Sequence, residues 1–424
     1  MQKSELAHSE LGSLREVPFM GVIYVVHEAS KLGFYNGHPD WCNLGQGQPE
    51  VGEMEGAPPR INNVEILPED HAYGPLGGTD AMRSTVANHY NRIFKNGSAF
   101  YKPTNICVAQ GGRLALTRVM AALGSVNVGY QLPDYTAYED MFNLHLARLN
   151  PIPIRTREAD GFQLTAARFA DEIDEKGLGA FVVSNPCNPT GNVIQGAELR
   201  EMVNIARDKN VTLILDEFYS HFIYLPDGRP ASGPVSAAPY ITDPDRDPIL
   251  LIDGLTKSYR YPGWRMGWIV GPTAMMDSIS RVASSVDGGP SRISQRAAMQ
   301  ALQPARADQE TTALRNVFVK KRNLLVSRLK QMGITFAAEP ASTFYGWASL
   351  QKLAPPLDDA MTFFRKALEQ KVMTVPGEFF DVNPGKRRKA ESPYKQWMRF
   401  SFGPPMDNLQ MGLDRLEKMI KANR

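Results

Sequence analysis

Short apolar runs alternate with amphipathic stretches through the middle of the chain. Strands are predicted where β-branched and other apolar residues run together, at Asn105–Ala109, Val126–Leu132, Ala180–Ser184, Val211–Leu215, Ile249–Ile252 and Met266–Val270. Helices are predicted between several of them, at Arg113–Leu123, Gly196–Lys209 and Thr273–Ser285. Fully apolar strands that alternate with helices are typical of a mostly parallel sheet covered by helices on both faces. The pattern therefore predicts an α/β fold.

The pattern changes after about residue 305. The predicted elements are then a long helix, a short strand region, a helix, a strand and a last helix, at Ala307–Met332, Thr335–Leu350, Asp358–Gln370, Met398–Phe402 and Asp407–Ala422. Such a series predicts a smaller α+β domain. The first fifty residues are too few to fold alone, so we expect them to join it. The prediction is a large α/β domain over residues 51–305 and a small domain made of residues 1–50 with 306–424.

Composition and charge exclude several classes of protein. Hydrophobic residues make up 43% of the 424 residues and charged residues 22%, which is typical of a globular protein. Lys and Arg number 47 against 45 Asp and Glu, and a net charge of +2 gives no electrostatic footprint for nucleic acid or an anionic membrane. No apolar stretch reaches the ~18 residues of a spanning helix. Acidic residues at positions 5, 10 and 16 interrupt any secretory signal.

Cysteines and histidines suggest neither disulfides nor a metal site. Cys42, Cys107 and Cys187 are widely spaced and odd in number, and the seven histidines form no HExxH-type pair. We therefore expect no metal and a reducing compartment, of which the cytoplasm is the simplest.

Lys257 follows the predicted strand at Ile249–Ile252, and ligands of α/β sheets bind at this edge. Arg265 comes eight residues later, behind a Pro-Gly turn. A guanidinium beside a lysine lowers its pKa and favours the nucleophilic amine. Most lysines are solvated surface charges, so this position alone does not show that Lys257 is a catalytic nucleophile.

Three further strand ends carry polar residues. Asp216 ends one strand and Tyr219 follows it; the carboxylate is either a turn or capping residue or a group buried to hold a positive charge. Asn188 belongs to the turn Asn-Pro-Thr-Gly, and a second Asn-Pro three residues earlier aims its amide at the sheet edge.

The third strand end is the run Gly111-Gly112-Arg113, which closes a strand and opens a helix. Its glycines either let backbone N–H groups approach a phosphate or serve the geometry of the turn alone.

Taken together, these segments resemble the fold-type I pyridoxal-phosphate enzymes, specifically the class I/II aminotransferases. The resemblance runs from about Leu44 to Phe402. It is carried in order by Tyr73…Gly78…Arg83, Gly111-Gly112-Arg113, Pro133-Asp134-Tyr135, Asn188-Pro-Thr-Gly191, Asp216-x-x-Tyr219, Thr256-Lys257 with Arg265, and Arg399. It implies a three-layer, mostly parallel sheet in a large domain beside a smaller α+β domain.

The resemblance also implies roles around a bound pyridoxal 5′-phosphate. Lys257 would form the Schiff base (internal aldimine) with the cofactor and later shuttle a proton. Asp216 would pair with the pyridine nitrogen and keep the ring an electron sink. Asn188 and Tyr219 would hydrogen-bond the phenolic oxygen, and Tyr135 would stack on the ring.

Further roles concern the phosphate, the substrate and the partner subunit. The phosphate would be held by Gly111, Gly112, Arg113, Thr256 and Arg265. Arg399 would bind the substrate α-carboxylate, in a pocket that Gly47 and Asn188 also line. Tyr73 would reach the phosphate of a neighbouring subunit, which implies a homodimer with shared active sites.

Two features depart from the family pattern or extend it. A hydroxyl residue usually stands three positions before the lysine, but this chain has Gly254, so one phosphate contact is missing unless Arg113 or Thr256 supplies it. The long loop of residues 377–396 carries a basic run, Lys386–Lys389, which is either solvated or faces an anionic group of the substrate.

The expected activity is transfer of an amino group between an L-amino acid and a 2-oxo acid. A cation for a distal substrate carboxylate could be Arg281 or Arg292. A lyase or cyclase on the same scaffold is the alternative, because such enzymes share these motifs. A non-catalytic, cofactor-binding sensor is a remote alternative.

Overall fold

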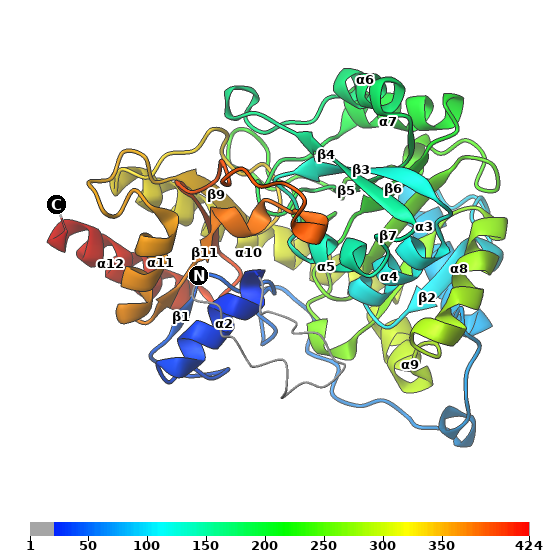
Figure 1. The fold of residues 1–424 in the computed structure, drawn as a ribbon. Coiled ribbons are helices and arrows are strands. Elements are labelled where there is room, and N and C mark those ends of the chain that lie inside the picture. Colours follow the sequence, from blue (N-terminus) through cyan, green and yellow to red (C-terminus); the bar gives the residue numbers. More distant parts are fainter. Residues whose placement is uncertain (1–20, 424) are drawn as a thin grey trace, which may run out of the picture.

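The computed structural model describes residues 21–423. Expectations for residues 1–20, including the acidic positions near the N-terminus, lie outside the described residues. Figure 1 shows two lobes: one is built around the large sheet, and the other contains α2 and the last helices of the chain. In the described part of the chain, no helix is long and apolar enough to cross a membrane.

The large lobe contains a seven-stranded sheet in the order β2-β8-β7-β6-β5-β3-β4. Among these strands, β8 alone runs in the direction opposite to the other six, so the prediction of a mostly parallel sheet is confirmed. The strands are β2 (Ile106–Ala109), β3 (Val126–Leu132), β4 (Leu149–Arg155), β5 (Leu178–Ser184), β6 (Thr212–Asp216), β7 (Ile249–Gly254) and β8 (Gly267–Val270).

Helices cover both faces of this sheet and give it three layers. In β7, Leu250 and Ile252 join one apolar core while Ile249 and Leu251 join the other, because successive side chains of a strand point to opposite faces. The helices are α3 (Asp80–Phe94), α4 (Gly112–Ala122), α5 (Ala137–Asn143), α6 (Ala166–Lys176), α7 (Gly196–Asp208), α8 (Thr273–Val286) and α9 (Arg292–Ala301).

The second lobe combines both ends of the described chain. β1 (Cys42–Asn43) pairs with β10 (Val372–Met373), and β12 (Trp397–Ser401) pairs with β9 (Tyr345–Ser349) and β11 (Val375–Pro376). The helices are α2 (Gly21–Lys31), α10 (Pro304–Gln331), α11 (Ala360–Glu369) and α12 (Met406–Ala422).

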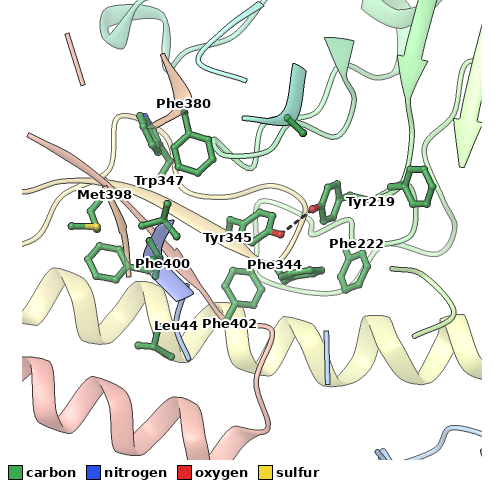
Figure 2. Close-up of a cluster of buried hydrophobic side chains, with 14 of the residues drawn as sticks. Leu44, Tyr219, Phe222, Phe344, Tyr345, Trp347, Phe380, Met398, Phe400 and Phe402 are labelled. Atoms are coloured by element: carbon green, nitrogen blue, oxygen red, sulfur yellow. Dashed lines mark hydrogen bonds between the residues drawn. The ribbon is translucent and has the colours of Figure 1, made fainter. Parts of the chain in front are cut away.

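An aromatic cluster joins the two lobes, as Figure 2 shows. Tyr219 and Phe222, just after β6, meet Phe344 with ring centroids 5.4 and 5.1 Å apart. Phe400 on β12 and Phe402 are fully buried in the same core. This packing fixes β9 and β12 against the carboxyl ends of the large sheet.

Candidate active site

A cavity of about 470 Å³ opens where the carboxyl ends of β5, β6 and β7 face the second lobe. Eleven of the residues singled out from the sequence line it: Gly47, Gly112, Arg113, Tyr135, Asn188, Asp216, Tyr219, Thr256, Lys257, Arg265 and Arg399. Parallel strands end at the same edge of a sheet, which is why positions so far apart in the sequence meet here.

Lys257 projects into this cavity from the loop after β7. Its Nζ donates a hydrogen bond to the carbonyl oxygen of Gly47. Burial, followed by the charge of the nearby Arg399, lowers the pKa of Lys257 to about 7, while Asp216 acts in the opposite direction. A large fraction of this amine is therefore uncharged near neutral pH, and an uncharged amine is a nucleophile and a proton acceptor.

Asp216 ends β6 on the floor of the cavity. The Tyr138 hydroxyl donates to its Oδ2 at 3.1 Å, and the Phe218 amide donates to its Oδ1 at 3.5 Å. Burial raises the pKa of Asp216 to about 6. A buried carboxyl of this kind ionises readily once a positive charge is placed beside it.

Tyr138 did not emerge from the sequence as a site residue. It lies on α5, three residues after Tyr135, and the two rings meet edge-on with centroids 5.5 Å apart. Tyr135 lies two residues before the helix, so no helical periodicity links the two positions. The sequence signal for Tyr138 was its closeness to Tyr135, and an aromatic residue at such a position more often marks core packing.

Two arginines lie beside the start of α4. Gly111 caps the helix with φ +83°, and a Cβ on it would lie 2.4 Å from Nη2 of Arg265, so only glycine lets this guanidinium lie there. Arg113 donates from Nε to the Tyr135 hydroxyl at 3.2 Å. Burial and the neighbouring Arg113 lower the pKa of Arg265. Two cations at the positive end of a helix favour an anion such as phosphate.

The surroundings of Gly254 explain why this chain lacks the hydroxyl residue that usually stands three positions before the lysine. A Cβ on Gly254 would lie 2.5 Å from the carbonyl oxygen of Met266, so this position has no room for the usual hydroxyl side chain. Thr256 lines the cavity instead, and its Oγ1 is buried with no hydrogen-bond partner among the described residues. A buried hydroxyl without a hydrogen-bond partner, next to two arginines, is suited to donate to a phosphate oxygen.

Arg399 enters the cavity from β12. Its Nη1 donates to Asn188 Oδ1 at 2.9 Å and its Nη2 donates to the carbonyl oxygen of Gly45 at 2.8 Å. Its Nε is buried without a hydrogen-bond partner among the described residues. The guanidinium also lies over the ring of Tyr345, 4.0 Å from its centroid. A buried cation with an unpaired donor suits a carboxylate ligand.

Tyr345 lines the cavity and was not singled out from the sequence. Its hydroxyl lies 2.9 Å from the hydroxyl of Tyr219, and either oxygen can donate. Burial raises the pKa of both phenols, so both stay protonated. Tyr345 lies on β9, where an aromatic residue is indistinguishable by pattern from core.

Other sequence candidates lie outside the cavity. Gly111 lies behind Arg265, and the side chain of Tyr73 is fully exposed. Arg281 lies 4.0 Å from Asp277, and Arg292 lies 3.7 Å from Asp70. Neither arginine lines the cavity.

Two charges of the basic run contact acidic residues. Lys386 pairs with Glu139 of α5, and Arg388 pairs with Asp381 at 2.7 Å. Among the described residues, no group of three or more His, Cys, Asp or Glu side chains could hold a metal ion. The three cysteines are buried and free.

Comparison with known proteins matches nearly the whole chain. A family model described as aminotransferase class I and II matches residues 39–416. The curated aspartate aminotransferase of Sulfurisphaera tokodaii is 25% identical over 392 residues, which cover 89% of each chain. A probable aspartate/prephenate aminotransferase of Aquifex aeolicus is 24% identical, with 82% of this chain and 83% of the relative covered.

Solved structures have the same fold. An aminotransferase from Mycobacterium tuberculosis superposes with a TM-score of 0.77 at 24% identity, covering 96% of this chain and 97% of that one. The aspartate aminotransferase of Thermus thermophilus with maleate gives a TM-score of 0.75 at 23% identity, covering 96% of this chain and all of the other.

Proposed function

The chain belongs to the class I and II aminotransferases, and on that premise we propose that the cavity is the active site of this pyridoxal 5′-phosphate enzyme. The observation that carries the proposal is the meeting of three chemistries in one cavity. These are an amine of lowered pKa on Lys257, a buried carboxyl on Asp216, and a two-arginine anion site at the start of α4. They match the carbonyl, the ring nitrogen and the phosphate of the cofactor.

The residues present fit the cofactor at each of its ends. Arg113, Arg265, the Thr256 hydroxyl and the free N–H groups at the start of α4 would hold the phosphate. Asp216 would pair with the pyridine nitrogen, and the Tyr135 ring would cover the ring face. When bound, pyridoxal phosphate supplies an electron sink for the bonds around the substrate Cα.

Lys257 would attach the cofactor covalently and handle the proton of the reaction. An amine with a pKa of about 7 can accept a proton from the substrate Cα near neutral pH and return it to a carbon atom. Asn188 and Tyr219 would donate to the phenolic oxygen of the cofactor. Tyr345 would orient Tyr219 through their hydroxyl contact.

Arg399 would bind the α-carboxylate that amino acids and 2-oxo acids share. Its Nε has no partner among the described residues, and its bonds to Asn188 and Gly45 hold the guanidinium in place. Because several relatives are named aspartate aminotransferases, aspartate and glutamate with their 2-oxo acids are the first substrates to test.

The large-scale arrangement is also part of the proposal. We place the large domain at residues 51–305 and the small domain at residues 1–50 with 306–424. The full exposure of the Tyr73 side chain supports a homodimer in which Tyr73 reaches the partner's phosphate site. The odd number of free cysteines supports a cytoplasmic location.

The test is the visible absorbance of the purified, cofactor-loaded protein, titrated with each amino acid in turn. A shift to the pyridoxamine form without ammonia release supports transamination, and the responding amino acid is the donor. Release of ammonia or of a cyclised product would instead mean a lyase or a cyclase. Absence of a visible band after adding the cofactor would overturn the assignment, and Lys257→Ala is expected to abolish the band and the turnover.

A further inference from the structure

The segment of residues 45–52 contacts both Lys257 and Arg399 of the proposed site. The carbonyl oxygen of Gly45 accepts a hydrogen bond from Arg399, and that of Gly47 accepts one from Lys257. The Glu50 amide donates to the carbonyl oxygen of Gly403 at 2.8 Å, close to the end of β12. A shift of this segment would therefore move the two carbonyl oxygens that hold Lys257 and Arg399.

Arg260 holds the far end of this segment. Its Nη1 donates to the carbonyl oxygens of Glu50 at 3.1 Å and Gly52 at 2.8 Å. Arg260 is fully buried, although it comes only three residues after Lys257, and its amide donates to the Lys257 carbonyl oxygen at 3.2 Å. Its backbone has φ +58°, a region that favours glycine, so an arginine here needs a compensating contact.

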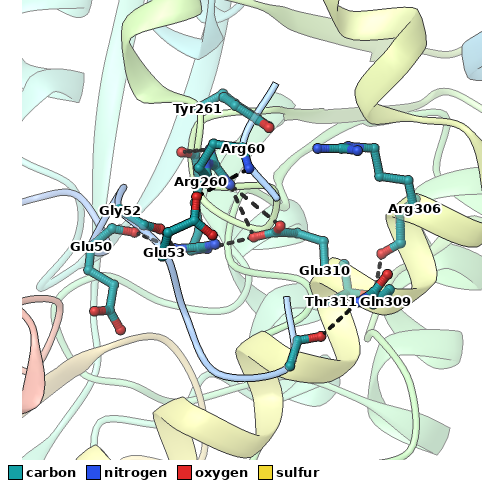
Figure 3. Close-up of polar contacts among 12 residues, drawn as sticks. Glu50, Gly52, Glu53, Arg60, Arg260, Tyr261, Arg306, Gln309, Glu310 and Thr311 are labelled. Carbon is teal, nitrogen blue, oxygen red and sulfur yellow. Dashed lines mark hydrogen bonds and ion pairs between the residues drawn. The ribbon is translucent and has the colours of Figure 1, made fainter. Parts of the chain in front are cut away.

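Glu310 of α10 supplies that contact. Its Oε1 accepts from Nε of Arg260 at 2.5 Å, and its Oε2 lies 3.4 Å from Nη1 of Arg60 (Figure 3). Arg60 in turn donates to the Arg260 carbonyl oxygen at 2.7 Å. A buried guanidinium needs a paired anion, and Glu310 provides it, while Nη2 of Arg260 has no hydrogen-bond partner among the described residues.

These contacts form a closed loop. It runs from Lys257 along three residues of backbone to Arg260, across two hydrogen bonds to Glu50 and Gly52, and back along the chain to Gly47, which contacts Lys257. A closed loop of short contacts allows little change in any one distance. Lys321, also on α10, reinforces it through an ion pair with Glu50 at 2.6 Å.

We propose that Arg260 and Glu310 are positioning residues that hold segment 45–52 against Lys257 and Arg399. The inference rests on the proposed function, because it concerns the same lysine and the same substrate arginine. Neither residue lines the cavity, so both act through the segment and not by touching the cofactor or the substrate.

The first variant is Arg260→Gly, which removes the guanidinium and leaves a residue that tolerates the positive φ. The second is Glu310→Gln, which keeps the size of the side chain and removes its charge. The matched control is Arg306→Ala. Arg306 is a half-buried arginine of the same helix as Glu310, and it binds the carbonyl oxygen of Pro59. Hydrogen exchange of residues 45–52 in the cofactor-free protein and steady-state kinetics of the holoenzyme are measured for each.

We expect faster exchange in residues 45–52 for both variants and no change for Arg306→Ala. The kcat/KM is expected to fall about 10- to 100-fold, because small misplacements of reacting groups cost that much. The fall should include a rise in KM, since Gly45 orients Arg399. The double variant should lose much less than the product of the two single losses, because both remove the same contact.

Unchanged exchange and kinetics within twofold of wild type in both variants would overturn the inference. A loss of Tm and cofactor content with unaltered KM would also overturn it, because that is the result of a purely structural role. If Arg260→Gly does not fold, the results of the isosteric variant Glu310→Gln alone test the inference. Lack of turnover in the wild-type protein with every amino acid would contradict the proposed function instead, and the exchange result would still test the positioning contact.

Discussion

Lys257 shows how one buried side chain acquires its chemistry from its neighbours. Burial removes water from the ammonium, and the guanidinium of Arg399 repels it, while the carboxyl of Asp216 opposes both. Burial is the largest cause, so most of the decrease in the pKa of Lys257 comes from the way the fold encloses this side chain. The contribution of Arg399 can be removed by a single substitution.

In the cofactor-free protein, labelling of Lys257 by an amine-directed reagent should rise with pH around a midpoint of about 7. Arg399→Met removes a nearby positive charge, so it should move this midpoint to higher pH. Mass spectrometry of the labelled peptide gives the midpoint, and an exposed lysine such as Lys352 serves as the internal reference. A midpoint unchanged or lowered by the substitution would contradict the assignment of Arg399 as a cause.

Glu217, the neighbour of Asp216, has a different role. Its carboxyl accepts from Ser236 Oγ at 2.6 Å and from the Ala237 amide at 2.8 Å, and it does not line the cavity. Burial raises its pKa from 4.5 to about 8. A raised pKa in the folded state stabilises the protein below pH 4.5, and this stabilisation disappears as the pH rises to about 8.

We therefore expect the free energy of unfolding of the cofactor-free protein to fall between pH 4.5 and 8. Glu217→Gln cannot ionise, so it should flatten this fall, and the exposed Glu175→Gln should leave it unchanged. Urea unfolding at pH 5, 6.5 and 8 measures the difference. Parallel curves for wild type and Glu217→Gln would mean that Glu217 is ionised in the folded protein.

At the scale of elements, α5 is held in place by the loop that follows β11. The amide of Asn383 donates to Glu139 at 2.8 Å, that of Gly385 donates to Asn143 at 2.7 Å, and Lys386 pairs with Glu139. α5 carries Tyr138, and Tyr135 lies just before it. The loop of the second lobe thus supports the part of the large lobe whose tyrosines contact Asp216 and Arg113.

Glu139→Ala should weaken this support. It leaves the Asn383 amide without its buried acceptor, which costs about 1–3 kcal/mol of unfolding free energy. The loosened α5 should also bind the cofactor more weakly, because Tyr135 and Tyr138 move with it. Urea unfolding and equilibrium cofactor binding measure both effects. Glu391→Ala, at an exposed pair in the same loop, is the control, and equal behaviour of the two variants would contradict a supporting role for Glu139.

Elements were predictable where the pattern is regular and local. The apolar runs of β3, β5, β6 and β7 were predicted to within a few residues. β4 (Leu149–Arg155) was missed because Pro151 and Pro153 argue against a central strand. The structure places β4 at the edge of the sheet, paired only with β3, where a strand tolerates missing donors.

The cavity was predictable only in part, because only some of its residues lie at positions that a local sequence pattern marks. Lys257, Asp216 and Asn188 follow strands, and the meeting of strand ends is a general property of parallel sheets. The contact of Arg260 with Glu50 and Gly52 joins positions 208 and 210 residues apart. No local pattern encodes such a contact, because it depends on how the lobes pack.

At the scale of the whole molecule, two segments that contact each other expose large apolar side chains. The side chains of Ile66, Tyr73 and Ile293 are exposed, and Asp70 between the first two is held by Arg296 of α9 at 2.9 Å. Exposed apolar side chains around a fixed segment favour contact with another protein. In the homodimer proposed above, a second copy of the chain would cover these side chains, and Tyr73 would reach the partner's phosphate site.

The proposed homodimer with shared active sites predicts rescue between two defective chains. Lys257→Ala should be inactive and Tyr73→Ala strongly weakened as homodimers. In a heterodimer of the two, purified through two different tags, one site combines an intact Lys257 with the intact Tyr73 of the other chain. Since one of two sites is then complete, kcat should be about half that of the wild type. If Tyr73 served its own chain, each site would retain one defect, and the heterodimer would be no more active than its parents.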